Sequence, residues 1–154
     1  MIPLRHMTLA DNRKALYDYE ILEKFQAGLV LTGQETKSVK NGQISLKGAY
    51  VTFRDGDAYL TNSHISKYKQ AGLLPDYDPT KSRRLLLRKR EIRYLQGKSQ
   101  EKGLTIVPLS VYTKKRFVKI EIAVARGKKQ YDKRETIKKR DAAREMRQII
   151  KNTH

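Results

Sequence analysis

Basic side chains are the residues of this sequence whose type and spacing indicate chemistry. Seven Lys or Arg residues and a single Glu fall between Lys81 and Arg93. A second group lies at the C-terminal end, where residues 126–154 carry 11 basic and 4 acidic side chains. Solubility alone is served by charges of mixed sign, so runs this lopsided favour contact with the phosphates of a nucleic acid.

The other reactive residue types give no catalytic or metal-binding pattern. Cysteine is absent, and histidine occurs at three scattered positions: His6, His64 and His154. Asp55 and Asp57 flank a glycine, a spacing that turn chemistry explains. Gly127-Lys128-Lys129 is similar to the end of a phosphate loop, but it lacks the following Ser or Thr and the earlier glycine. We therefore expect no enzyme, no metal site and no cofactor.

Composition places the basic groups on a single domain with a tail. The chain has 154 residues, 38% of them hydrophobic, and a net charge of +18. Residues 1–80 carry 10 basic and 9 acidic side chains, whereas residues 81–125 carry 13 and 3. An excess so segregated opposes a compact fold unless a polyanion neutralises it, and nucleic acid is the expected partner. An anionic membrane is the alternative, disfavoured because Trp is absent. No apolar run is long enough for a signal peptide or a membrane span, so we expect a cytoplasmic protein without membrane contact.

The first half of the chain shows strand and turn patterns. Residues 17–31 are rich in β-branched and aromatic residues, which predicts a strand, and residues 34–40 predict a short helix. Residues 49–53 and 58–60 flank Asp55-Gly56, a pair that readily adopts the positive φ values of a tight hairpin turn. Residues 75–79 are predicted to form a loop.

A helix is predicted from about Lys81 to Gln96, with Thr80 as its cap and Gly97 at its end. At about 100° per residue, one arc collects apolar residues and another collects guanidinium groups. These are Leu85, Ile92 and Leu95 on the first arc, and Arg83, Arg90 and Arg93 on the second. One face would be buried while the other contacts RNA or phosphate.

Two further strands, 104–112 and 117–125, complete a mainly β fold class. We predict a small antiparallel OB-like β-barrel with about three accessory helices over residues 1–125. Barrels of this size bind nucleic acid on the outside, since side chains fill the interior.

Residues 126–154 form a separate basic C-terminal tail in this interpretation. Asp132 and Glu135 are spaced to open a helix. Beyond them, Ala142, Met146 and Ile149 make only a narrow apolar stripe. We expect this tail to be disordered when free and to become helical on a partner.

Several segments occur together in an order and spacing that resemble one family. They are Asn12-Arg13-Lys14-Ala15, Tyr17-Asp18-Tyr19, Phe25 to Leu31, Glu35-Thr36-Lys37-Ser38, Asp78-Pro79-Thr80, Arg84 to Leu87, and Gly127 to Arg134. From about Asn12 onward the chain resembles the SsrA-binding proteins. Each segment is weak evidence alone, whereas the ordered set is specific.

This resemblance implies an oligonucleotide-binding-type barrel that binds the tRNA-like domain of transfer-messenger RNA. The tail would occupy the decoding centre of a stalled ribosome's small subunit and the empty mRNA channel, where it becomes helical. Alanyl-tRNA synthetase and elongation factor Tu act on the same RNA and are implied partners.

Candidate residues follow from the matched positions and from the basic runs. The RNA-binding set is Asn12, Arg13, Lys14, Tyr17, Gln26, Lys37, Lys81, Arg83, Leu86 and Lys119. The ribosome-binding tail set is Gly127, Lys128, Lys129, Asp132, Lys133, Arg134 and Ile150. Three positions depart from the family pattern: Gln26 replaces Glu, Tyr17 replaces a frequent His, and Arg126 replaces Lys.

Two other functions are compatible with the residues alone. One is a general RNA chaperone or ribosomal-protein-like binder with a nonspecific tail. The other is a hydrolase whose site the sequence patterns do not reveal. RNA cleavage in the presence of Mg²⁺ would support the hydrolase, whereas a flat response of binding to salt would contradict both RNA-binding functions.

Overall fold

The computed structural model describes residues 6–128 and 130–152, with side chains for residues 7–128, 134 and 137–148. The strands are β1 (His6–Asp11), β2 (Tyr19–Leu29), β3 (Ile44–Ser45), β4 (Tyr50–Arg54), β5 (Asp57–Thr61), β6 (His64–Ile65), β7 (Arg83–Leu86), β8 (Leu104–Lys114) and β9 (Phe117–Gly127). The α-helices are α1 (Arg13–Asp18), α2 (Gly33–Lys40), α3 (Lys89–Ser99) and α4 (Gln130–Asn152), and a 3-10 turn, η1, spans Lys69–Ala71.

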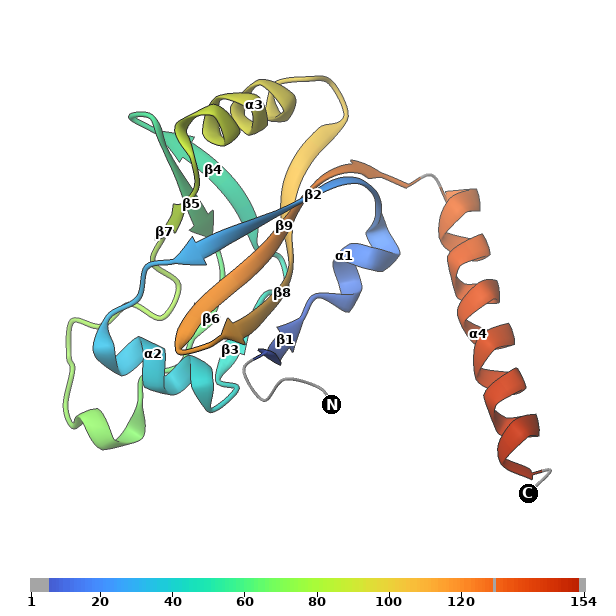
Figure 1. Cartoon of the computed structure of the whole chain (residues 1–154), viewed down its shortest axis with the longest axis horizontal. Coiled ribbons are helices and arrows are strands. Elements are labelled where there is room, and N and C mark those ends of the chain that lie inside the picture. The colour runs from blue at the N-terminus through green and yellow to red at the C-terminus, as the bar shows by residue number, and fades with distance from the viewer. Residues whose placement is uncertain (1–5, 129, 153–154) are drawn as a thin grey trace.

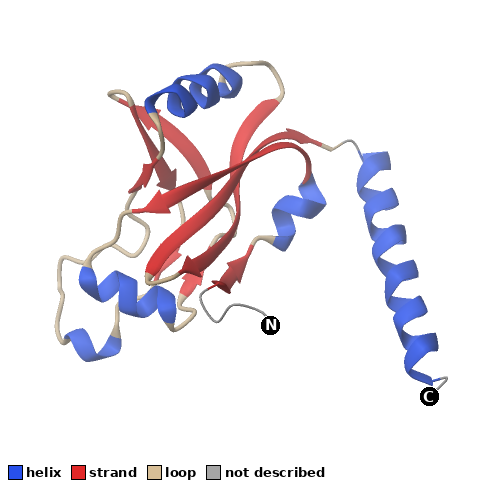
Figure 2. Cartoon of the chain, in the orientation of Figure 1, coloured by secondary structure: helices blue, strands red, loops and turns tan. Residues whose placement is uncertain are grey.

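Seven strands form one antiparallel sheet in the order β1-β8-β9-β2-β7-β5-β4, and β3 pairs with β6 in a small second sheet. Strands β1 and β4 are the two edges, and no hydrogen-bonded ladder joins them among the residues that the structure describes. The antiparallel sheet of the predicted OB-like barrel is therefore confirmed, but the described residues form no closed barrel. The fold is mixed α/β, mostly antiparallel sheet, with four α-helices in the described part of the chain. Helices α2 and α3 lie at opposite ends of the sheet, and α4 stands beside α1 (Figures 1 and 2).

Local predictions in the first half of the chain are largely confirmed. Strands β4 and β5 form the predicted hairpin, and its turn residues Asp55 and Gly56 have φ values of 52° and 80°. Helix α2 begins at a capping box in which Thr32 and Glu35 each accept a backbone N–H of the other. The predicted strand over 17–31 is β2, but it begins only at Tyr19 because residues 13–18 form α1.

The predicted helix from Lys81 to Gln96 is wrong in its first half. Residues 83–86 form β7, in which Arg83 and Leu85 are buried while Arg84 and Leu86 are exposed. This alternation has the period of a strand, and Arg83 fits the buried side because it has an acidic partner there. Helix α3 follows, beginning where the Glu91 carboxylate accepts the N–H of Arg88.

The core lies between the curved sheet and the elements that cover it. Its largest buried side chains include Leu60, Leu85, Leu95, Ile106 and Ile120. A smaller apolar cluster lies under α1, where Ala15 packs with Val107, Leu109, Ala123 and Ala125 of β8 and β9. Among the described helices, none is long and apolar enough to cross a membrane.

Candidate nucleic-acid interface

Helix α1 presents three of the predicted RNA-binding side chains, and Asn12 fixes its position. The Asn12 side chain is 5% exposed; its amide donates to the carbonyls of Leu46 (3.3 Å) and Pro108 (2.8 Å). Its Oδ1 accepts the N–H of Ala15 at 3.2 Å and so caps the helix. Asn12 therefore positions the helix from inside, whereas Arg13 and Lys14 are exposed and Tyr17 is half-buried.

A second surface gathers Gln26, Leu86 and Lys119, which lie far apart in the sequence. They line a hollow of about 640 Å³ over β2, β7 and β9, together with Lys24, Phe25, Leu87, Arg88 and Glu91. We call this the sheet hollow. The strand register explains its assembly, because Gly28 lies opposite both Leu86 of β7 and Lys119 of β9. Lys24, Arg88 and Lys119 supply three cations around one exposed leucine, a combination suited to phosphate and ribose.

Gly28 determines how Leu86 lies in the sheet hollow. A Cβ built on Gly28 would lie 3.2 Å from the Cβ and 3.3 Å from the Cδ1 of Leu86, so the leucine occupies the space that a side chain would need. Leu86 is nevertheless 54% exposed and offers its outer face to solvent. Because Gly28 has no side chain, Leu86 packs directly against β2 while its outer face stays exposed. No sequence pattern indicated this role, because Leu86 lies 58 positions further along the chain.

Gln26 is held between two groups of the neighbouring strands. Its Nε2 donates to Glu121 Oε2 at 2.9 Å, and the hydroxyl of Tyr112 donates to its Oε1. Burial raises the pKa of Tyr112, and the Glu121 carboxylate adds to this shift. An amide can donate to one neighbour and accept from the other, whereas a Glu at this position would face Glu121 as a like charge. Gln at position 26, where the family pattern has Glu, is therefore compatible with its neighbours Tyr112 and Glu121.

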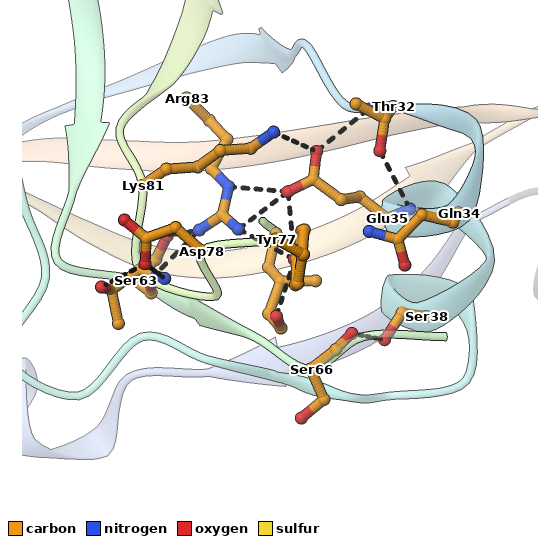
Figure 3. Close-up of polar contacts among 12 residues, drawn as sticks. Thr32, Gln34, Glu35, Ser38, Ser63, Ser66, Tyr77, Asp78, Lys81 and Arg83 are labelled. Carbon is orange, nitrogen blue, oxygen red and sulfur yellow. Dashed lines mark hydrogen bonds and ion pairs between the residues drawn. The ribbon is translucent and has the colours of Figure 1, made fainter. Parts of the chain in front are cut away.

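A buried polar network anchors α2, which carries Lys37 (Figure 3). Glu35, 1% exposed, accepts from Arg83 Nε at 3.0 Å and Nη2 at 2.8 Å, both on Oε2. Its Oε1 accepts the Thr32 N–H at 3.0 Å and lies 3.7 Å from Lys81 Nζ. Lys37 is exposed on the same helix, with its ammonium 5.7 Å from the Tyr68 ring. The network joins α2 to β7 and so fixes where Lys37 is presented.

Burial raises the pKa of Glu35, but the Thr32 N–H, Arg83 and Lys81 outweigh it, and the net shift is downward. Arg83 itself is only 2% exposed and also donates to the Ser63 carbonyl at 3.2 Å. The prediction that Arg83 contacts RNA is therefore corrected, because its guanidinium is committed inside the protein. Lys81 lies at the edge of this network, with 41% of its side chain exposed.

The tail residues are distributed over the end of β9 and α4. Gly127 ends β9, and Lys128 is bonded to the end of α1: its N–H donates to the Asp18 carbonyl at 2.9 Å and its Nζ to the Leu16 carbonyl at 3.1 Å. Arg134 is exposed on α4. Lys129 lies outside the described residues. Asp132, Lys133 and Ile150 lie within α4, but their side chains are outside the described set.

The structure therefore brings the sequence-predicted residues together in three places rather than one: α1, the sheet hollow and α2. A fourth set was missed, the arginines of α4 that face α1, because no local pattern links residue 13 to residue 140. Within the described part of the chain, no group of three His, Asp or Glu side chains is arranged to hold a metal.

Comparison with known proteins decides the family. The family model described as SmpB protein matches residues 9–152, which is nearly the whole chain. This chain belongs to the SmpB protein family. The predicted resemblance to SsrA-binding proteins is thereby confirmed.

Individual SmpB relatives align along almost their full length. The SsrA-binding protein of Leuconostoc mesenteroides subsp. mesenteroides is 54% identical over 144 residues, covering 94% of this chain and 93% of the relative. That of Trichodesmium erythraeum is 50% identical over 143 residues, covering 93% and 92%. A chain in the solved structure "tmRNA-SmpB: a journey to the center of the bacterial ribosome" has a TM-score of 0.65 and 41% identity. The match covers 83% of this chain and 93% of that one.

Proposed function

We propose that this SmpB family member binds transfer-messenger RNA and acts with it in trans-translation, the rescue of stalled ribosomes, as an RNA-binding protein and not as an enzyme. The observation that carries this function is the family match over residues 9–152, which includes the sheet from residue 9 onward and the whole of α4. The relatives are SsrA-binding proteins, and a solved relative belongs to a structure of tmRNA-SmpB and the bacterial ribosome.

We further propose a division of work between residues 1–125 and 126–154. The body binds the tRNA-like domain of the RNA through α1, the sheet hollow and α2, with Arg13, Lys14, Tyr17, Gln26, Lys37, Leu86 and Lys119 as contacts and Lys81 beside them. Asn12 supports these contacts from inside. Exposed cations around an apolar patch suit recognition of a bent RNA by shape and phosphate position, without reading its sequence.

The tail, in this proposal, acts on the ribosome. Gly127, Lys128, Lys129, Asp132, Lys133, Arg134 and Ile150 contact the decoding centre and the empty mRNA channel of the small subunit. We propose that the helix α4 of the structure is the form that the tail takes on the ribosome, and that the tail is disordered when free. Its ordering cost is then met only where the channel is vacant. Alanyl-tRNA synthetase and elongation factor Tu are partners through the shared RNA, and the site of action is the bacterial cytoplasm.

Truncation after Lys128 tests this division. The cut leaves β9 and the two bonds from Lys128 to α1 in place. We expect binding to the tRNA-like domain to change far less than the tagging of stalled peptides, which is lost. If the truncation weakens both by the same factor, the tail is a general RNA anchor and the proposed division is wrong.

A further inference from the structure

Helices α1 and α4 enclose a groove whose walls are strongly cationic. It has a volume of about 610 Å³ and is lined by Arg13, Leu16 and Tyr17 on one side and by Arg140, Arg144, Arg147 and Gln148 on the other. We call it the arginine groove. Four of its seven lining residues carry a guanidinium group, and none of the residues that line it is acidic.

Lys128 holds one end of the arginine groove in place. Its backbone N–H and its ammonium both donate to carbonyls in the last turn of α1, those of Asp18 and Leu16. Carbonyls in the last turn of a helix point away from its hydrogen-bonded interior and accept such donors, and a cation there also interacts favourably with the helix dipole. Lys128 is therefore fixed beside α1, and α4, which begins at Gln130, has one face toward Arg13.

The spacing of the α4 arginines places them on that face. Residues 140, 144 and 147 fall within an arc of about 60° at 100° per residue, and the row spans about 10 Å along the helix. Arg13 lies across from them on α1. The acidic residues Asp141 and Glu145 line a second hollow of α4, which shares Arg144 and Gln148 with the arginine groove. Both acids are about 90° or more from the centre of the arginine row.

The four arginines face one another across a groove whose lining contains no acidic side chain. Within the described residues, none of them forms an ion pair with a carboxylate, and the three on α4 are exposed. Like charges across a groove repel, so the arrangement is favourable only when an anion lies between the two helices. Guanidinium groups bind phosphate through paired N–H donors, and the Tyr17 ring lies in the same wall.

We propose that the arginine groove binds the phosphodiester backbone of an RNA strand lying between α1 and α4. This inference rests on the proposed function, because it assigns the strand to an RNA that the protein already meets. The strand neutralises the guanidinium groups from both sides and thereby holds α4 against α1. The RNA belongs either to transfer-messenger RNA or to the small ribosomal subunit, and the experiment distinguishes these two sources.

The test uses the full chain and two matched double variants of α4. Arg140→Gln with Arg144→Gln removes two charges from the groove. Lys138→Gln with Lys139→Gln removes two charges that lie about 150° and 110° from the centre of the groove face. Glutamine keeps a good helix propensity in both variants, and circular dichroism checks that they have equal helix content. Affinity is measured against salt concentration for the tRNA-like domain and, separately, for small ribosomal subunits.

Each phosphate contact on a single strand contributes about 0.7 to the slope of log affinity against log salt concentration. The groove variant, which removes two contacts, should therefore lose about 1.4 units of this slope for one of the two RNAs, and the control variant much less. The RNA that shows this loss is the source of the strand. Arg13→Gln and Arg144→Gln, measured singly, should each lose about 0.7 units for that same RNA, because both residues contact one strand. Equal losses in the groove and control variants, or losses of the two single variants on different RNAs, would overturn the proposal.

The outcome also separates this inference from the proposed function. If the wild-type chain prefers the tRNA-like domain but the groove and control variants lose equal amounts of salt slope, only the proposal for the arginine groove is refuted. A wild-type chain without that preference refutes the proposed function, whatever the variants show.

Discussion

Replacing Arg83 with Met removes the cation from the buried pair with Glu35 while keeping a side chain of similar length. The pair is almost fully enclosed, with both side chains 1% exposed, and both N–H contacts reach the same carboxylate oxygen. Removing one partner of a buried pair costs about 3–5 kcal/mol, because the other charge remains buried without its partner. At a urea dependence of about 2 kcal/mol per M, the unfolding midpoint should fall by about 2 M.

The neighbouring residue supplies the control. Arg84 pairs with Asp57 at 3.2 Å, but 53% of its side chain is exposed, so Arg84→Met should cost at most about 1 kcal/mol. Combining Arg83→Met with Glu35→Gln should cost less than the sum of the two single changes, because the second change removes the charge that the first leaves unpaired.

Acid provides an independent measure of the same pair. The pKa of Glu35 is lowered in the folded state, so its contribution to stability is complete above its unfolded pKa and is lost as the pH falls through the folded pKa. The difference in unfolding free energy between wild type and Glu35→Gln should therefore shrink on acidification. A cost below about 1 kcal/mol for Arg83→Met in urea, equal to that of Arg84→Met, would refute the assignment of a buried, paired guanidinium. So would loss of RNA binding by a fully folded Arg83→Met protein.

Three further substitutions test the surfaces that surround this network. Asn12→Ala removes the cap of α1 and leaves the Leu46 and Pro108 carbonyls without their donor. The free energy of unfolding, measured in urea, should therefore fall by about 2–3 kcal/mol. An unchanged unfolding midpoint would contradict the positioning role of Asn12. Gly28→Ala should weaken binding of the tRNA-like domain by displacing Leu86. Gly97→Ala is the control: its new methyl group meets nothing within 4 Å, so binding should be unchanged while α3 is stabilised by about 1 kcal/mol. Equal binding by both variants would show that the position of Leu86 is unimportant. Gln26→Glu places a second carboxylate against Glu121, so it should lower the thermal stability at neutral pH, and this loss should be recovered in acid. Thermal melts at a neutral and an acidic pH measure this. A loss of stability that is the same at both pH values would contradict it.

The parts of the fold that were predictable are those whose cause is local. Asp55-Gly56 specifies a tight turn by its own backbone preferences, and Thr32 and Glu35 cap α2 within one helical turn. The family resemblance and the segregation of charge also need no knowledge of long-range contacts. These features are readable because the residues that determine them are neighbours in the sequence.

The errors have a common origin in contacts between distant residues. Arg83 and Arg84 have the composition of a solvated helix face, and burial of Arg83 becomes favourable through distant partners, above all the carboxylate of Glu35, 48 residues earlier. The short helix α1 depends on an Asn12 side chain that reaches Pro108, 96 residues away. Whether seven strands close into a barrel or stay open depends on sheet twist and edge positions, which alternation of residue types does not encode.

The candidate site divides in the same way. Lys119, Leu86 and Gln26 were named from matched motifs, but their common hollow follows from the register of three strands around Gly28. The arginine groove joins residues 13 and 140–147, which no motif connects. Residue types could be predicted from the sequence, whereas the surfaces they form required the fold.

The central claim is that the exposed cations of residues 1–125 are neutralised by one structured RNA, the tRNA-like domain. The most direct measurement is a competition in which the full-length protein is bound to the tRNA-like domain of transfer-messenger RNA and challenged with tRNA-sized unrelated RNA and with heparin at physiological salt. We expect the tRNA-like domain to resist displacement by both competitors. Displacement by either one at equal phosphate concentration would contradict it.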